Sequence, residues 1–426
     1  MKKVLIVTYY WPPAGGPGVQ RWLKFVKYLR DFDIEPIVYI PENPHYPIED
    51  PSLVKEVPKN ISVHSRPVFE PYGFAKLLSS KKTRRISSGI IQNKNQSLVE
   101  KAMLWVRGNY FIPDARKFWV KPSVAYLSEL LKTENITTLV TTGPPHSVHL
   151  IGRSLKKELN LTWFADFRDP WTSIGYHKKL KLSKAAQEKH KALEKAVLTE
   201  ADHIITTSET TKREFRGLTD RPISVITNGY DTGYAAEVDL DKNFTISHIG
   251  SLLTGRNPKN LWKALSRIAS ENAVFRADLQ LEFMGVVSQD VMDSLYRYEL
   301  GPYIKMRGYV SHAEAQRKQR QSQLLLLVEI DSEETKGILP GKLFEYIQAK
   351  RPILAMGPKE WEAGSIIAKT KSGKTFDYNS DSELTSAILA WYDAYKKNEL
   401  VSTSVDIEVY SRRALTERLA HLINQN

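Results

Sequence analysis

Short apolar segments alternate with helical segments along nearly the whole chain. Residues 4–8 form a largely apolar run, residues 20–29 have helical spacing, and residues 36–40 are apolar again. Such alternation is typical of a parallel sheet with helices on both faces, because each helix carries the chain back to the start of the next strand. The same pattern starts afresh at residues 244–248 and continues to 324–328. The sequence therefore predicts two α/β units.

The length of the chain agrees with two units. A chain of 426 residues exceeds the usual size of one hydrophobic core, so two domains of about 200 residues are expected. A polar stretch over 232–242 is interpreted as the linker between them. A final amphipathic helix over 410–422 presents Leu415, Leu419 and Leu422 at helical spacing. We expect this helix to dock against one of the domains.

The sequence favours neither disulfides nor a membrane span. It contains no cysteine, which also removes thiolate metal sites and is compatible with a reducing compartment. The apolar start ends at residues 9–13, too early for a secretory signal peptide. The longest later apolar run, 324–328, is far shorter than the roughly 20 residues needed to cross a bilayer. We expect a cytoplasmic protein.

The net charge of +13 is concentrated in one segment. Residues 76–121 contain eleven Lys and Arg against two acidic residues, a net charge of +9. Such a segment favours a polyanionic neighbour, either nucleic acid or an anionic membrane face. Aromatic and basic residues do not interleave as in nucleic-acid recognition modules, so no nucleic-acid partner is expected. We predict that 76–121 docks on an anionic membrane, helped by Leu104, Trp105, Tyr110, Phe111, Phe118 and Trp119.

A glycine-rich loop follows the first strand. Gly15, Gly16 and Gly18 precede a helix, so their backbone N–H groups can approach an anion at the helix N-terminus. Arg21 occupies the position of the last glycine of G-x-G-x-x-G, so the dinucleotide fingerprint is not met. A tight turn without a ligand is the alternative.

Two further loops of the first unit carry polar side chains. His146 follows a strand at the crevice where open α/β sheets bind ligands, and acts either as a polar contact or as a structural or capping residue. Asp166 ends the next strand and is followed by Arg168, Asp169 and Trp171. These groups either contact a ligand or form an Asp–Arg pair that fixes the loop.

Cations follow the first strand of the second unit. Gly250 lies at the end of that strand, and Arg256 and Lys259 come in the loop before the next helix. Cations at this position can hold a diphosphate, and Arg suits forked contacts with phosphate oxygens. Solvated side chains are the alternative.

Residues 336–346 combine a glycine loop with a helix that carries an acid. Gly337 and Gly341 open the helix, and N–H groups of such a loop can bind phosphate. Glu345 lies about one turn inside and can accept hydrogen bonds from two vicinal hydroxyls, as on a ribose. A salt bridge between Glu345 and Lys342 is the competing interpretation.

Metal chemistry has little support in the sequence. The D-x-D strings at 31–33 and 239–241 lie at a helix end and in the linker, where we expect solvated acids. No Ser-His-Asp set, H-E-x-x-H string or P-loop string occurs. We predict neither a metal site nor a cofactor.

Taken in this order, the motifs resemble those of family 4 glycosyltransferases, retaining enzymes of GT-B fold, along nearly the whole chain. The matching positions are 15–18, 143–146, 201–208, 228–231, Gly250 with Arg256, 308–310 and 340–346. The resemblance implies two Rossmann-like, doubly wound parallel-sheet domains facing a central cleft. We place an acceptor-side domain at 1–205, a nucleotide-sugar-binding domain at 206–405, and at 406–426 a C-terminal helix that packs back on the N-terminal domain.

The resemblance also implies roles for individual residues. Glu345 would bind the ribose, Arg256 the diphosphate, and the backbone around Tyr309 the base. The glycine loop would lie under the phosphates or the donor sugar, and His146 would contact that sugar near the reacting carbon. The predicted catalytic residues are His146, Arg256 and Asp166. The predicted donor-binding residues are Gly15, Gly16, Gly18, Gly250, Lys259, Tyr309, Lys336, Gly337, Gly341, Lys342 and Glu345.

Two positions depart from the family pattern. The family often has a second Glu eight residues before the ribose-binding one, where this chain has Gly337. It also often has Arg directly after the glycine equivalent to Gly250, where this chain has Ser251. Lys336 and Lys259 are the two candidates to replace the lost charge.

The resemblance implies a retaining transfer of a hexose-type sugar from a UDP- or GDP-linked donor to a glycan or lipid-linked acceptor, in cell-surface polysaccharide synthesis. No clear carboxylate nucleophile is present, which favours front-face attack assisted by the departing diphosphate, without a metal. The main alternative is an inverting transferase or a nucleotide-sugar 2-epimerase of the same fold. A basic adaptor for membranes or nucleic acid is the weaker one. We expect the enzyme in the cytoplasm, at the inner face of the cell membrane.

Overall fold

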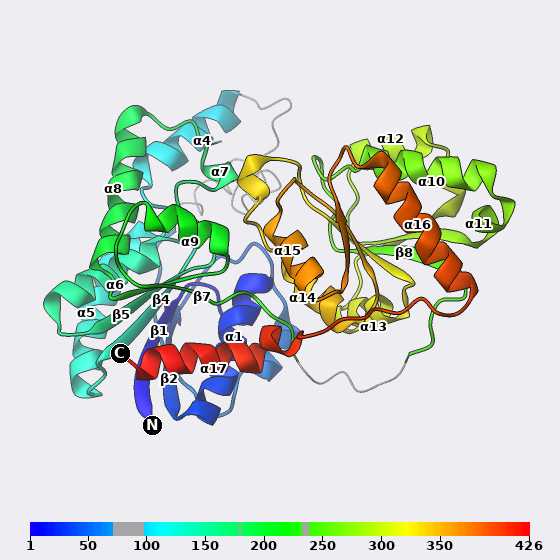
Figure 1. Cartoon of the computed structure of the whole chain (residues 1–426). Coiled ribbons are helices and arrows are strands. Elements are labelled where there is room, and N and C mark those ends of the chain that lie inside the picture. The colour runs from blue at the N-terminus through cyan, green and yellow to red at the C-terminus, as the bar shows by residue number, and fades with distance from the viewer. Residues whose placement is uncertain (71–97, 179, 232–237) are drawn as a thin grey trace. The chain divides into compact units, whose positions relative to one another are not determined.

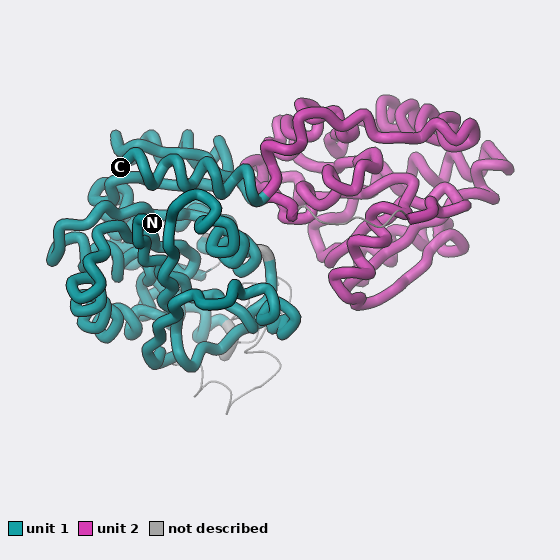
Figure 2. The backbone as a smooth tube through the Cα atoms, turned by 90° about the horizontal axis from the view of Figure 1, so that it is seen from below, with its two compact units in different colours: residues 1–228, 412–426 teal, residues 229–411 magenta. Residues whose placement is uncertain are grey.

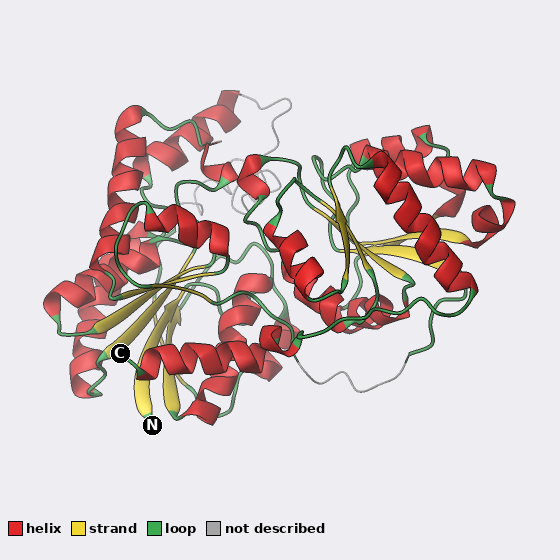
Figure 3. Cartoon of the chain, viewed as in Figure 1, coloured by secondary structure: helices red, strands yellow, loops and turns green. Residues whose placement is uncertain are grey.

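The computed structural model describes residues 1–70, 98–178, 180–231 and 238–426, and it divides into two compact units (Figure 2). Unit 1 comprises residues 1–228 and 412–426, and unit 2 comprises residues 229–411. Each unit is a parallel α/β domain, as predicted, in which strands and helices alternate along the chain (Figure 3). Among the helices in these ranges, none is long and apolar enough to span a bilayer.

The unit boundaries differ from the predicted domain boundaries. The predicted junction at 205/206 falls inside β6 (His203–Thr206), which together with β7 (Ile223–Val225) belongs to the sheet of unit 1. Unit 1 therefore continues to residue 228, because these two parallel strands extend its sheet before the chain leaves. The returning segment begins at residue 412 rather than 406.

Unit 1 is built on a seven-stranded parallel sheet with the order β3-β2-β1-β4-β5-β6-β7. Its remaining strands are β1 (Lys2–Thr8), β2 (Ile34–Pro41), β3 (Ser62–Arg66), β4 (Thr138–Gly143) and β5 (Thr162–Phe167). Its α-helices within the described ranges are α1 (Pro17–Leu29), α4 (Leu98–Tyr110), α5 (Lys117–Thr133), α6 (Ser147–Glu158), α7 (Gly175–Lys178), α8 (Lys184–Glu200), α9 (Glu209–Arg216) and α17 (Arg412–Asn424). Residues 4–7 of β1 are fully buried, as expected for a central strand covered on both faces.

The C-terminal helix α17 packs on α1 of unit 1, as predicted (Figure 1). Leu415, Leu419 and Ile423 are buried and belong to the core of this unit. Leu422, which the spacing also assigns to the apolar face, is only partly buried, because Ile423 takes the inward position one turn after Leu419. The guanidinium of Arg412 donates to the side-chain oxygen of Gln20 at 2.7 Å.

Unit 2 is built on a six-stranded parallel sheet with the order β10-β9-β8-β11-β12-β13. The strands are β8 (Phe244–Ile249), β9 (Leu279–Met284), β10 (Ile304–Gly308), β11 (Leu324–Val328), β12 (Ile353–Met356) and β13 (Gly373–Phe376). The α-helices are α10 (Lys259–Glu271), α11 (Ala273–Asp278), α12 (Gln289–Arg297), α13 (His312–Gln321), α14 (Gly341–Gln348), α15 (Glu362–Lys369) and α16 (Asp381–Lys396). Alternate residues of β11 enter two different apolar clusters, one on each face of the sheet, which explains its continuous apolar run.

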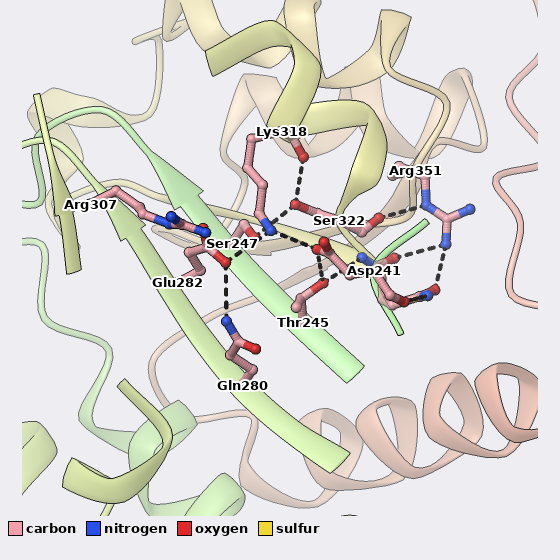
Figure 4. A network of polar contacts seen from close by, with 10 residues as sticks. Asp241, Thr245, Ser247, Gln280, Glu282, Arg307, Lys318, Ser322 and Arg351 are labelled. Carbon is pink, nitrogen blue, oxygen red and sulfur yellow. Dashed lines mark hydrogen bonds and ion pairs between the residues drawn. The ribbon is translucent and has the colours of Figure 1, made fainter. Parts of the chain in front are cut away.

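A buried polar network ties the start of β8 to its neighbours in unit 2 (Figure 4). Lys318 on α13 contacts Glu282 of β9 at 2.8 Å and Asp241 at 2.7 Å. Arg307 of β10 approaches Glu282 at 2.8 Å, and the hydroxyl of Thr245 donates to Asp241 at 2.8 Å. Asp241 therefore accepts bonds from Lys318 and Thr245 within unit 2, whereas the sequence predicts a solvated acid in the linker.

Glu282 is the centre of this network. Its side chain is fully buried, and burial alone would raise its pKa, but hydrogen bonds from Lys318 and Arg307 hold the pKa below its ordinary value. The carboxylate is therefore ionised and held by two cations. Removing one partner of a buried ion pair destabilises a protein, because an uncompensated charge is left inside.

We expect Lys318→Ala to lower the free energy of unfolding of unit 2 by about 3 kcal/mol. Lys263→Ala is the matched control, because it removes an exposed ion pair with Asp381 and should cost less than about 1 kcal/mol. Urea denaturation of the full chain, monitored by hydrogen exchange at the amides of β9, measures the free energy of unfolding of both variants. Equal effects of the two substitutions would contradict the prediction.

Candidate active site

The strand order reverses once in each sheet, and each reversal marks a place for a ligand. In unit 1 the chain runs outward from β1 through β2 to β3 and then crosses to β4 on the other side of β1. In unit 2 the same reversal separates β8 from β11. Open α/β sheets bind ligands beyond the carboxyl ends of the strands at such a point. The predicted residues fall into two groups, one at each reversal.

In unit 2 the chain turns at Gly250, directly after β8. Its φ of +111° favours glycine, and a Cβ atom there would lie 2.9 Å from Nζ of Lys342. The backbone N–H of Ile249 donates to the hydroxyl of Tyr346 on α14 at 2.9 Å. The start of α14 is thereby fixed against the end of β8.

Arg256 is oriented at this reversal by an acid that follows β11. Its Nε lies 2.9 Å from Oε1 of Glu329, and its Nη2 lies 3.1 Å from Oε2. Glu329 is buried, whereas the side chain of Arg256 is 31% exposed. Such a forked pair fixes the plane of the guanidinium. Its exposed portion can meet an anion.

Lys342 is the second cation at the turn. Its Nζ lies 3.2 Å from Nε2 of His248, and Nδ1 of His248 lies 2.9 Å from the carbonyl oxygen of Leu326. Nδ1–H therefore donates to that carbonyl, and Nε2 accepts from the ammonium group. Burial, followed by the charge of Lys342, lowers the pKa of His248 far below its usual value, so the ring is neutral. Burial, followed by repulsion from Arg256, lowers the pKa of Lys342 to about 8.

The other two lysines predicted for this site point to different partners. Lys336 pairs with Glu333 at 2.8 Å and with Glu360 at 3.3 Å. Lys259 is exposed at the start of α10. Lys342, rather than either of them, contacts the turn at Gly250. This chain has Ser251 where the family often has Arg, and Lys342 is the cation beside the turn instead. Lys342 lies close to Gly250 because α14 packs on the end of β8.

Glu345 lies one turn into α14, which begins at Gly341, shortly after Gly337. Its carboxylate accepts a hydrogen bond from Nε2 of Gln319 at 3.0 Å. Lys342 is bonded to His248 instead, so the competing Glu345–Lys342 salt bridge does not form. Tyr309, directly after β10, is 94% exposed and presents an open aromatic ring. The roles of Glu345 and Tyr309 in nucleotide binding stay predictions.

In unit 1 the glycine loop joins β1 to α1. The N–H of Gly15 donates to the carbonyl of Ile48 at 2.9 Å. Gly16 has a φ of +101°, and a Cβ atom there would meet no atom of the described residues within 4 Å. Gly18 packs directly on the guanidinium of Arg168, with no room for a side chain. Only Gly16 therefore leaves open space beside the loop.

Arg168 joins this loop to the turn after β4. Its Nε donates to the carbonyl of Gly143 at 3.2 Å, and its Nη2 donates to the carbonyl of Pro144. The sequence suggests that Arg168 pairs with an acid, but the guanidinium binds backbone carbonyls and supports Gly18 instead. Arg168 is thus a scaffold residue of the site.

Asp166 has a structural role rather than the predicted catalytic one. Its Oδ1 accepts from Nη2 of Arg21 at 2.9 Å, and its Oδ2 accepts from Trp22 at 2.7 Å and from Thr142 at 2.8 Å. Burial alone would raise the pKa of Asp166, but the charge and hydrogen bond of Arg21 lower it. A fully buried carboxylate with both oxygens occupied has no place for a substrate. The predicted Asp–Arg pair forms with Arg21, not Arg168.

His146 lies at the start of α6 and is 5% exposed. Its ring stacks on Trp171 with the centroids 4.7 Å apart. Neither ring nitrogen has a hydrogen-bond partner among the described residues. Burial, followed by His149, holds the pKa of His146 far below its usual value. The neutral ring therefore offers one N–H donor and one acceptor.

Helix α8 holds Trp171 against His146. The backbone N–H of Trp171 donates to Glu194 at 3.1 Å, and its indole N–H donates to Nδ1 of His190 at 3.1 Å. The sequence predicts α8 only as a charged amphipathic helix. No local sequence pattern indicates that its side chains Glu194 and His190 are buried against Trp171.

A pocket of about 290 Å³ opens beside His146 within unit 1. Of the two acids in the D-F-R-D string, Asp169 lines this pocket and Asp166 does not. The distinction was available from position, since Asp166 lies inside β5 and Asp169 lies beyond its end. His177 and His190 also line the pocket and were missed, because they come from α7 and α8, which carry no motif.

Metal ligands do not cluster in the parts of the chain that the structure describes. No group of three or more His, Asp or Glu side chains is arranged there to hold a metal ion. Metal independence of the reaction stays a prediction.

Comparison with known proteins identifies the class. Residues 90–234 match the model of Glycosyltransferase Family 4, whereas no curated protein matches the chain. Sucrose-phosphate synthase from Thermosynechococcus elongatus has a TM-score of 0.60 at 12% identity, covering 100% of this chain and 99% of that chain. A Staphylococcus aureus TarM variant in complex with fondaparinux, α-GlcNAc-glycerol and UDP has a TM-score of 0.57 at 13% identity, covering 100% of both chains. WaaG, a glycosyltransferase involved in lipopolysaccharide biosynthesis, has a TM-score of 0.55 at 13% identity, covering 99% of this chain and 100% of that chain.

These likenesses establish the fold. The segment that matches the family model, residues 90–234, includes the turn at Gly143, the D-F-R-D string and α8. The protein is therefore a glycosyltransferase of GT-B fold. Within that class, residues 90–234 match the model of family 4.

We expect the affinity for a nucleoside diphosphate to fall as the pH rises above about 8, because the pKa of Lys342 is about 8. Below that pH the ammonium group is charged and attracts the diphosphate, and above it the group loses its proton. Lys342→Arg stays charged and should keep its affinity, whereas Lys342→Met should bind weakly throughout. Calorimetry with UDP and with GDP measures this, and the same fall in the Arg variant would refute the assignment.

Proposed function

We propose that this protein is a retaining glycosyltransferase that moves a hexose-type sugar from a UDP- or GDP-linked donor to a glycan or lipid-linked acceptor. The observation that carries the proposal is the placement of Arg256 and Lys342 beside the glycine turn at the strand reversal of unit 2. The TarM structure holds UDP, and WaaG is involved in lipopolysaccharide biosynthesis. Both support a nucleotide-sugar donor and a role in cell-surface polysaccharide synthesis.

In this proposal the donor is bound by residues around α14 and the turn after β8. Arg256 and Lys342 bind the diphosphate, with the N–H groups of Gly337 and Gly341 as further contacts. The N–H of Gly250 is already bonded to the carbonyl of Met284 at 2.8 Å. Glu345 accepts hydrogen bonds from the ribose hydroxyls, and Tyr309 lies at the base. The proposal also assigns the donor sugar to His146 and the glycine loop of unit 1.

The proposed reaction is a front-face displacement. The acceptor hydroxyl oxygen forms a bond to the anomeric carbon on the side from which the diphosphate departs, and its proton passes to a phosphate oxygen of the leaving group. Negative charge grows on the diphosphate as the glycosidic bond breaks. Arg256 and Lys342 stabilise that charge in the proposed transition state, so the reaction depends on positioning and electrostatics rather than on a metal.

Arg256→Lys should lower kcat by about 100-fold, because the forked contact to the leaving group strengthens in the transition state. The Lys side chain keeps a cation beside buried Glu329, which Arg256→Ala would leave unpaired. Glu345→Ala should instead weaken nucleotide binding about 10-fold or more and affect KM. Lys263→Ala, exposed on α10, is the control.

The assay measures release of nucleotide from a panel of UDP- and GDP-sugars, with and without EDTA, and the anomeric configuration of the product. Activity that survives EDTA and a product of retained configuration support the proposal. An inverted product, an epimer formed without acceptor, or an activity abolished by EDTA and restored by magnesium would contradict it.

We also propose that unit 1 docks on an anionic membrane. Residues 76–97 of the predicted basic segment lie outside the described residues. Of the predicted apolar groups, Leu104 and Trp119 belong to the buried core, whereas Trp105, Tyr110 and Phe118 are exposed. Lys117 lies 5.2 Å from the ring centroid of Phe118, so charge and exposed aromatic surface adjoin. Such surfaces suit the headgroup region of a bilayer.

Full-length protein should sediment with vesicles that contain anionic lipid and not with neutral vesicles. Each basic residue near the surface contributes about 1 kcal/mol, so binding should weaken at high salt. Trp105→Ala and Phe118→Ala should each reduce binding, whereas Tyr296→Ala, which removes an exposed aromatic ring of unit 2, should not. Binding that is indifferent to lipid charge would disprove membrane docking by this segment.

A further inference from the structure

Helix α13 brings a buried amide against the helix that carries the proposed ribose ligand. Gln319 lies near the end of α13 and is buried. Its Nε2 lies 3.0 Å from Oε2 of Glu345 on α14. A carboxylate only accepts hydrogen bonds, so the amide nitrogen, and not the amide oxygen, faces Glu345. Lys342, one turn earlier on α14, contacts His248 instead. The donor that holds Glu345 is therefore a neutral group.

The place of Gln319 is set by the attachment of α13 to the sheet of unit 2 (Figure 4). Lys318, the preceding residue, is buried and forms an ion pair with Glu282 at 2.8 Å. The hydroxyl of Ser322, two residues after the helix begins its last turn at 319–321, lies 2.7 Å from the hydroxyl of Ser247 on β8. A shift of α13 along the sheet would break these buried polar contacts, which is costly. The amide of Gln319 is thus held at a fixed place beside α14.

A glutamate that binds two hydroxyls of one ring needs a fixed carboxylate plane. The terminal torsion of a Glu side chain has broad minima, so the plane rotates easily when no other group holds it. The hydrogen bond from Gln319 removes that freedom from Glu345. An ionised carboxylate has about four acceptor positions, of which Gln319 takes one. The remaining positions suffice for two vicinal hydroxyls, and the uncharged amide does not cancel the charge that strengthens those bonds.

We propose that Gln319 is a positioning residue for ribose recognition, and that the carboxylate it orients makes the site select a ribonucleotide over the 2′-deoxyribonucleotide. The 2′-deoxyribose ring of a nucleoside diphosphate offers one hydroxyl where ribose offers two, so an acceptor position of the fixed carboxylate stays unpaired. A carboxylate that rotates freely adapts to the single hydroxyl and discriminates less. This inference rests on the proposed function, in which Glu345 binds the ribose, and it adds the residue that orients Glu345.

Calorimetry on the full chain with UDP, GDP and their 2′-deoxy counterparts tests the inference. Wild type should bind at least one ribonucleotide about 10-fold or more tightly than its 2′-deoxy counterpart, because a hydrogen bond to a charged group is lost. Gln319→Met keeps the length of the side chain but has no donor, and it should lower this ratio to about 3 or less. Its affinity for the 2′-deoxynucleotide should stay within about 2-fold of wild type, which also shows that the variant is folded.

Gln316→Met is the matched control. Gln316 is also a buried amide on α13, but it bonds to His312, so its substitution should leave the ratio unchanged. A double-mutant cycle then shows whether Gln319 acts through Glu345. Glu345→Ala should bring the ratio close to that of a site without discrimination. Gln319→Met added to Glu345→Ala should not change the ratio further.

Three results would overturn the inference and leave the proposed function standing. They are an unchanged ratio in Gln319→Met, an equal loss of affinity for both kinds of nucleotide in that variant, and a wild type that binds both kinds equally. A further change of the ratio when Gln319→Met is added to Glu345→Ala would also overturn it, since Gln319 would then act without Glu345. Failure of both UDP and GDP to bind would sink the proposed function together with this inference.

Discussion

The reversal of strand order in each parallel sheet is the constraint on which the rest of the structure depends. All strands of a unit run in one direction, so the loops that matter lie beyond one edge of its sheet. At the reversal, neighbouring strands send their chains to opposite sides and leave a place between the loops. The turn at Gly250 and the acid Glu329 occupy such a place in unit 2, and the glycine loop and His146 occupy it in unit 1. Their chemistry follows from that geometry.

Buried acids hold the cations and loops of both units in position. Asp166 fixes Arg21, Glu329 orients Arg256, and Glu282 binds Lys318. Each acid is almost completely buried, and an ionised carboxylate at such depth requires a partner. Arg256 differs from the other two cations because its side chain remains partly exposed and can meet an anion. The same kind of ion pair thus serves the scaffold in two cases and presents a binding group in the third.

Much of the fold could be predicted from the sequence, and the site only in part. The period of the apolar segments predicts parallel sheets, and the spacing of the last leucines predicts that α17 docks. The boundary between units could not be read correctly, because β6 and β7 have no signal that assigns them to one sheet rather than another.

Within the site, the failures have two physical causes. Loops at strand ends were located correctly, but which acid faces solvent depends on whether it lies inside the strand, as Asp166 does, or beyond it, as Asp169 does. Likewise, Lys342 reaches Gly250 through packing between α14 and β8, a contact distant in sequence. The contact of Lys342 depends on packing between elements that lie far apart in sequence, and no local pattern contains it. The place of Asp169 beyond the end of β5, in contrast, could be inferred from its position.

The central claim is that the strand reversal of unit 2 binds the nucleoside diphosphate. Hydrogen exchange of the full chain, measured by mass spectrometry with and without saturating UDP or GDP, tests it most directly. Binding should slow exchange at the amides of residues 249–256 and 337–346, because a ligand held there covers the turn at Gly250 and the start of α14. Slowed exchange confined to other segments, while the nucleotide is bound, would contradict the account.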